Sequence, residues 1–136
     1  GSFEGDDINE TWKQVALAAG IGPVDDVQKI INQIGIYKFR EATKKADPRL
    51  LAENKQELDE RMVRAIDVLN DLTKNEKRVL LVSHGDFIKT LAIKYWEKSD
   101  GLHDVPFPDN GSVTRGILND DGKFEIVDYN VNAENL

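Results

Sequence analysis

The feature that most constrains the fold of this chain is the stretch VLLVSHGDFIKTLAI, residues 79–93. Residues 79–83 are almost all β-branched or apolar, without polar alternation, which is typical of a strand buried on both faces in a parallel sheet. From Phe87 onward, apolar residues recur at helical spacing, and Asp86 is a candidate N-cap. The stretch therefore predicts a strand, a tight turn and a helix, with His84 at the carboxyl end of the strand.

This predicted turn is a candidate ligand site. In open α/β sheets, ligands bind at the carboxyl ends of the strands, and the N–H groups at the start of a helix favour an anion. Gly85 would let a ligand approach the backbone closely. His84 is then either a ligand-binding side chain or a structural residue held by hydrogen bonds. Ser83 either orients the imidazole or forms a hydrogen bond within the turn.

Composition excludes several classes of protein. The 136 residues fit one domain, and the contents of 40% hydrophobic and 32% charged residues are typical of neither a membrane protein nor a disordered one. Because the chain has no cysteine, it forms no disulfide and no thiolate metal site, which is compatible with the cytoplasm. The net charge of −7 argues against a general nucleic-acid binder. An anion site in this chain must therefore use a few local cations and backbone dipoles.

Periodicity predicts most of the other elements. Helical spacing predicts helices over 8–19, 25–34 and 58–72, and a strand near 113–118 is followed by a hairpin turn at 120–122 and a return strand over 124–129. Residues 36–50 give a mixed pattern. Their basic side chains form either a solvated helix face or a surface that meets an anionic substrate; they are Arg40, Lys44, Lys45 and Arg49.

Other catalytic motifs are missing from the sequence. It has no GxGxxG, no glycine-rich phosphate loop and no HExxH, and its two histidines do not make a metal site. Ser83 and His84 do not form part of a triad, because neighbours on a strand point to opposite faces.

Four stretches together resemble one known family. VLLVSHGDFIKTLA resembles the second histidine motif of the histidine phosphatase superfamily, also called the phosphoglycerate mutase-like family. Residues 1–5 resemble its FGxxEG segment, and residues 52–54 with Arg61 resemble its ES…R helix segment, with Asn where Ser is usual. Residues 108–114 resemble the stretch that leads into its next strand.

The resemblance implies a three-layer α/β/α sandwich, with a mostly parallel sheet and an antiparallel last strand. Residues 1–136 would form a single, truncated domain, with 20–52 as a variable cap. The family's nucleophile is a histidine in an Arg-His-Gly motif on its first strand, and this sequence contains no such motif. Its other histidine, His103, lies in a polar loop. We therefore expect a carboxyl-terminal part whose sheet is completed by a missing amino-terminal segment or by another copy.

The resemblance also implies phosphoryl transfer through a phosphohistidine. One histidine attacks phosphorus, an acid protonates the leaving oxygen, and two arginines and a second histidine hold the phosphoryl oxygens. His84 matches that second histidine, and Gly85 would bind phosphate beside it. The candidates for substrate contact are Glu4, Asn110 and Ser112, although Glu4 is alternatively a solvated carboxylate.

The expected substrate is a small phosphorylated molecule, with no cofactor, no metal, no nucleic acid and no membrane as partner. The family includes phosphomonoesterases and mutases, which this sequence does not separate. The alternative function is a non-catalytic phosphate-binding or interaction domain that keeps only the second histidine.

Overall fold

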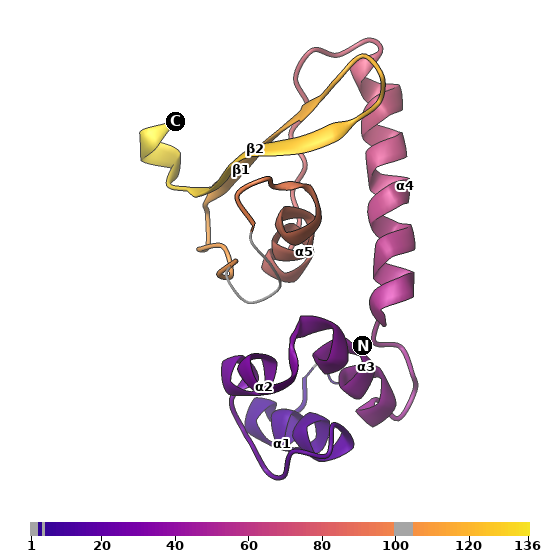
Figure 1. Cartoon of the computed structure of the whole chain (residues 1–136), viewed down its shortest axis with the longest axis vertical. Helices are drawn as coiled ribbons and strands as arrows, with labels where there is room; N and C mark the ends of the chain where they lie inside the picture. Colours follow the sequence, from indigo (N-terminus) through magenta and orange to yellow (C-terminus); the bar gives the residue numbers. More distant parts are fainter. Residues whose placement is uncertain (1–2, 4, 100–104) are drawn as a thin grey trace. The chain divides into compact units, whose positions relative to one another are not determined.

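The structure, a computed structural model, describes residues 3, 5–99 and 105–136. Its contacts divide the chain into two compact units, residues 1–61 and 62–136. The described residues form a mixed α/β structure with the following elements: α1 Ile8–Ala18, α2 Val27–Ile34, α3 Ile36–Ala46, α4 Lys55–Thr73, α5 Gly85–Tyr95, β1 Val113–Leu118, β2 Phe124–Val131 and the 3-10 helix η1 Ala133–Asn135 (Figure 1). The predicted helices near 8–19, 25–34 and 58–72 are confirmed as α1, α2 and α4.

The first unit is built on α1, α2 and α3, and Figure 1 shows these helices packed together. Asp7 caps α1, and Asp26, one residue after the Asp25 that the pattern favoured, caps α2. The rings of Trp12 on α1 and Phe39 on α3 lie 5.8 Å apart. The core of this unit contains the buried side chains of Val15, Ala16, Ile30, Ile31, Ile36 and Ala42.

Helix α3 occupies most of the region whose pattern was mixed. It follows α2 directly at Gly35, whose φ of 80° is a backbone conformation that favours glycine. At the other end, the buried carboxylate of Asp47 accepts hydrogen bonds from the N–H groups of Arg49, at 3.0 Å, and Ala52, at 2.8 Å. This carboxylate therefore fixes the loop between α3 and α4.

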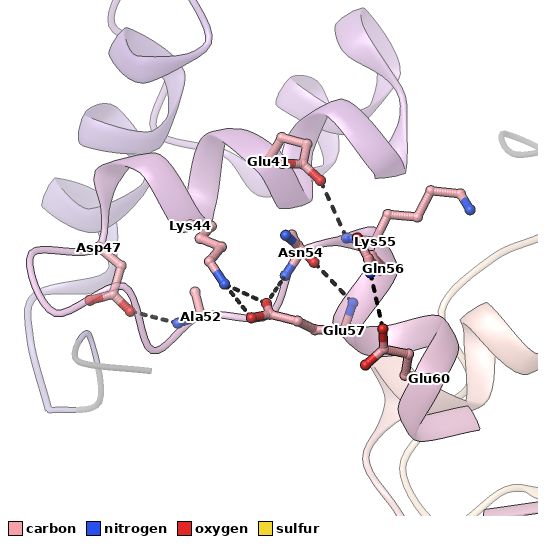
Figure 2. Close-up of polar contacts among 9 residues, drawn as sticks. All are labelled: Glu41, Lys44, Asp47, Ala52, Asn54, Lys55, Gln56, Glu57 and Glu60. Atoms are coloured by element: carbon pink, nitrogen blue, oxygen red, sulfur yellow. Dashed lines mark hydrogen bonds and ion pairs between the residues drawn. The ribbon is translucent and has the colours of Figure 1, made fainter. Parts of the chain in front are cut away.

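The start of α4 is held by reciprocal capping, as Figure 2 shows. The Asn54 side chain accepts from the Glu57 N–H, and the Glu57 carboxylate accepts from the Asn54 N–H, both at 2.9 Å. Lys44 on α3 donates to the same carboxylate at 2.5 Å, and this bond, with the one from Asn54, lowers the pKa of Glu57. Glu53 pairs with Arg61 at 2.7 Å. The segment 52–54 and Arg61 thus hold the start of α4 and the loop before it in place.

The second unit packs α5 against a β-hairpin. β1 and β2 pair antiparallel, and the predicted turn is confirmed, with Gly122 donating to the Asn119 carbonyl. Trp96, at the end of α5, forms a parallel bridge with Ile126 and packs on the ring of Tyr129 at 5.3 Å. A Cβ at Gly116 would lie 2.5 Å from the Phe124 ring, so this position of β1 accepts only glycine without a shift.

The predicted buried strand over 79–83 is wrong for this structure. These residues form no strand, and Leu80 and Val82 are each 85% exposed. The sheet among the described residues has two antiparallel strands, not the expected mostly parallel arrangement. The physical reason is that a strand needs a neighbour for its backbone hydrogen bonds, and no described segment pairs with this one. Leu72, near the end of α4, is also exposed although its spacing predicted burial.

Candidate functional site

His84 stands at the N-cap position of α5. Its backbone is extended, with φ −92° and ψ 151°, and its carbonyl accepts the first helical bond, from the Ile88 N–H at 3.1 Å. Asp86 therefore lies in the first turn of the helix, and its prediction as the N-cap is wrong. The imidazole is exposed and forms no capping hydrogen bond. It is thus presented to solvent at the positive end of a helix dipole, where an anion is favoured.

The start of α5 lies against the segment that leads into β1. A Cβ built on Gly85 would meet the Pro108 ring at 3.5 Å, which is ordinary van der Waals contact. The Cβ side of Gly85, where the lack of a side chain would let a ligand approach the backbone closely, is therefore next to a proline. This contact brings Gly85, which follows His84 in the chain, beside the segment that carries Asn110 and Ser112.

Asn110 and Ser112 belong to a tight turn. The Ser112 N–H donates to the Asp109 carbonyl at 3.1 Å, and Gly111 has a positive φ of 77°. The turn at Asn110-Gly111 was predicted from the sequence and is confirmed. Asn110 is exposed and Ser112 is half-buried.

Lys89 is a residue of this region that the sequence reasoning missed. It is only 2% exposed, and its amino nitrogen lies 4.4 Å from the centre of the Phe107 ring. Burial lowers the pKa of Lys89, and the charge of Asp86 opposes that effect. No sequence signal marked it, because helical spacing places Lys89 on the side opposite the apolar Phe87 and Leu91, whereas the structure buries both sides. Lys89 thus links α5 to the segment just before the turn.

The other predicted residues belong to the first unit or lie outside the described residues. Glu4 and His103 lie outside the described residues. Of the basic residues predicted to meet either solvent or an anion, Lys44 is bound to Glu57, and Arg40 is 6% exposed. An open depression of about 390 Å³ in the first unit is lined by Ala18, Ala19, Ile34, Lys38, Glu41, Ala42 and Lys45, none of which was a predicted site residue apart from Lys45.

The described residues contain neither a metal-binding cluster nor a helix that could span a membrane. Over residues 3, 5–99 and 105–136, no group of three His, Cys, Asp or Glu side chains is placed to hold a metal ion. In the same part of the chain, no helix combines the length and the apolar character needed to cross a membrane.

Comparison with known proteins identifies a family. The sequence profile described as histidine phosphatase superfamily (branch 1) matches residues 25–132, which is more than half of the chain. The match includes His84, Gly85, Asn110 and Ser112, whereas residues 1–5 lie before it, so their resemblance to FGxxEG stays a prediction. Searches of curated proteins and of solved structures found no significant match. Because the profile covers most of the chain, including the site at the start of α5, the chain belongs to the histidine phosphatase superfamily.

Proposed function

We propose that this chain is part of an enzyme that transfers or hydrolyses a phosphoryl group through a phosphohistidine. The observation that carries the proposal is the exposed His84 imidazole at the N-terminus of α5, within the residues that the family profile matches; its neighbour Gly85 lies against Pro108, in the segment that leads to Asn110 and Ser112. Superfamily membership makes an enzyme of the phosphatase or mutase type plausible. In this proposal the substrate is a small phosphorylated molecule, the protein works in the cytoplasm, and the reaction requires no metal.

In this proposal, the nucleophile is a different histidine, which lies outside residues 1–136, since the sequence contains no Arg-His-Gly. That imidazole forms a bond to phosphorus while the ester P–O bond breaks, and an acid gives a proton to the departing alcohol. Water or a second hydroxyl then takes the phosphoryl group from the imidazole, which makes the enzyme a phosphatase or a mutase. His84 donates a hydrogen bond to a phosphoryl oxygen as charge builds on it, and Gly85 lies beside that oxygen.

The same proposal accounts for the exposed segment 79–83. We propose that it becomes a central strand of a mostly parallel sheet in a three-layer sandwich when a neighbouring strand is present. The high exposure of Leu80 and Val82 supports this, because apolar side chains that lie together on a surface mark a place of contact. A segment outside residues 1–136 supplies the neighbour; a second copy of the chain is the other candidate.

His84→Ala in the full-length protein tests the proposed role. Turnover of a phosphomonoester should fall by a factor of about 100 or more, which is the scale of losing one preorganised donor. The fold should survive, because an exposed side chain contributes little packing, and the melting temperature reports this. The matched control is His103→Ala, which removes the chain's other histidine and should leave turnover near that of the unmodified protein. Unchanged turnover in His84→Ala would refute the role of His84.

The same protein separates the proposal from its alternative, a non-catalytic phosphate-binding domain. Titration with inorganic phosphate should show binding in both cases, and binding should weaken in His84→Ala. Only the enzyme should also hydrolyse or transfer phosphate. Binding without turnover would favour the non-catalytic domain.

A further inference from the structure

Asn130 has an unusual backbone conformation in β2. Its φ is 55°, in the left-handed region, where asparagine is tolerated better than most residues. The register of the two strands explains this positive φ. Val113 pairs with Val131 and Arg115 with Asp128, so between these pairs one residue of β1 faces two residues of β2, which is a β-bulge. Bulges change the direction of a side chain, and this one redirects Asn130.

The Asn130 amide is directed at the start of the turn that carries Asn110 and Ser112. Its Oδ1 accepts from the Asp109 N–H at 2.7 Å, and its Nδ2 donates to the Asp109 carboxylate at 3.5 Å. The Asp109 carbonyl in turn accepts from the Ser112 N–H at 3.1 Å, which closes the turn. The two bonds from one amide therefore fix both the backbone and the side chain of the residue that begins the turn.

The neighbouring residue holds the same segment at a second point. The Tyr129 hydroxyl donates to the Pro106 carbonyl at 2.5 Å. Between these two points, Pro108 rests against Gly85, and Phe107 lies under the Lys89 amino group. The segment 106–109 is thus held between β2 and α5, against Gly85, the residue after His84.

We propose that Asn130 is a positioning residue that sets the place of Asn110 and Ser112 relative to His84. This inference rests on the proposed function, since it gives that turn a role in holding the substrate. In this proposal Asn130 does not touch the phosphoryl group. It acts through Asp109, which lies 21 residues earlier in the chain.

Asn130→Gly in the full-length protein separates the side chain from the backbone. Glycine adopts a positive φ without strain, so the bulge is kept while the amide is lost. Hydrogen exchange at the Asp109 N–H should become about tenfold faster, the scale of one net hydrogen bond, and kcat/KM for a phosphomonoester should fall about tenfold, mainly through KM. The control Asn119→Gly makes the same change at the far end of the hairpin and should leave both values unchanged.

A second test exchanges the amide and the carboxylate between positions 130 and 109. Asn130→Asp alone places two carboxylates together and should lower kcat/KM, whereas adding Asp109→Asn restores one donor and one acceptor and should recover it. Unchanged exchange at Asp109 in Asn130→Gly would overturn the inference, and so would faster exchange with unchanged kcat/KM. Absence of turnover and of phosphate binding in the unmodified protein would instead refute the proposed function, while exchange at Asp109 would still show whether Asn130 holds the turn.

Discussion

The Tyr129 hydroxyl makes a sharp prediction about stability and pH. Tyr129 is 9% exposed, its hydroxyl donates to the Pro106 carbonyl at 2.5 Å, and burial raises its pKa from 10.0 to about 12. Tyr129→Phe removes the hydroxyl and keeps the ring that packs on Trp96. At neutral pH, the variant should lose one net hydrogen bond, which lowers the free energy of unfolding by about 1 kcal/mol.

The sign of the effect reverses at high pH. A pKa raised in the folded state means that the protonated phenol is favoured by folding, so this stabilisation is complete below pH 10 and is lost as the pH rises toward 12. Each unit of difference corresponds to about 1.36 kcal/mol, so the unmodified protein should lose about 2 kcal/mol by pH 11.5 through this group. Tyr129→Phe has no proton to lose and should then be the more stable protein, by about 1 kcal/mol.

Urea unfolding of the full-length protein, followed by tryptophan fluorescence, measures the free energy of unfolding at pH 9 and at pH 11.5. The difference between the unmodified protein and the variant cancels the titration of all other groups. The control is Tyr37→Phe, in the other unit, which keeps the Tyr129 hydroxyl. Its free energy of unfolding should still fall at high pH, as in the unmodified protein. A difference between the unmodified protein and Tyr129→Phe that is the same at both pH values would refute the reasoning.

Three further predictions concern other parts of the chain. Asp47→Ala should lower the free energy of unfolding, measured by urea unfolding, by about 1–3 kcal/mol, because two N–H groups lose a buried acceptor. The control Asp71→Ala, which breaks an exposed ion pair, should lower it by under about 1 kcal/mol. A crystal soaked in phosphate should hold the anion within hydrogen-bond distance of His84, and an empty site would contradict the proposed phosphate-binding role. The polypeptide 1–136 expressed alone should be poorly soluble, since Leu80 stays exposed, and inactive toward phosphomonoesters, since it lacks the proposed nucleophile; a soluble monomer with a cooperative melt and turnover would show that the catalytic histidine has been misplaced.

Local signals explain why the helices were predictable. Asp7 and Asp26 cap α1 and α2 through hydrogen bonds that span only a few residues, and the apolar spacing of each helix is visible in the sequence. Helix α3 was predicted only as one of two alternatives, a solvated helix face, because its start depends on the positive φ of Gly35 and because it buries most of Arg40, a residue type that patterning assigns to the surface.

Non-local contacts explain what the sequence did not reveal. A strand is completed by a neighbour that can lie far away in the chain, so the apolar pattern of 79–83 indicates a tendency without supplying the partner. The same holds for the site. His84 and its helix were predictable from their own residues, whereas the contact of Gly85 with Pro108, and the bonds from Asn130 to Asp109, join residues more than 20 positions apart.

The central claim is that His84 binds the phosphoryl group while another histidine, outside residues 1–136, carries it. The direct measurement is to mix the full-length protein with a phosphomonoester, stop the reaction with alkali to preserve phosphohistidine, and locate the modified residue by peptide mass spectrometry. The account predicts a phosphoryl adduct on a histidine of an Arg-His-Gly segment, and loss of this adduct in His84→Ala. An adduct on His84 itself, or an adduct that persists undiminished in His84→Ala, would contradict it.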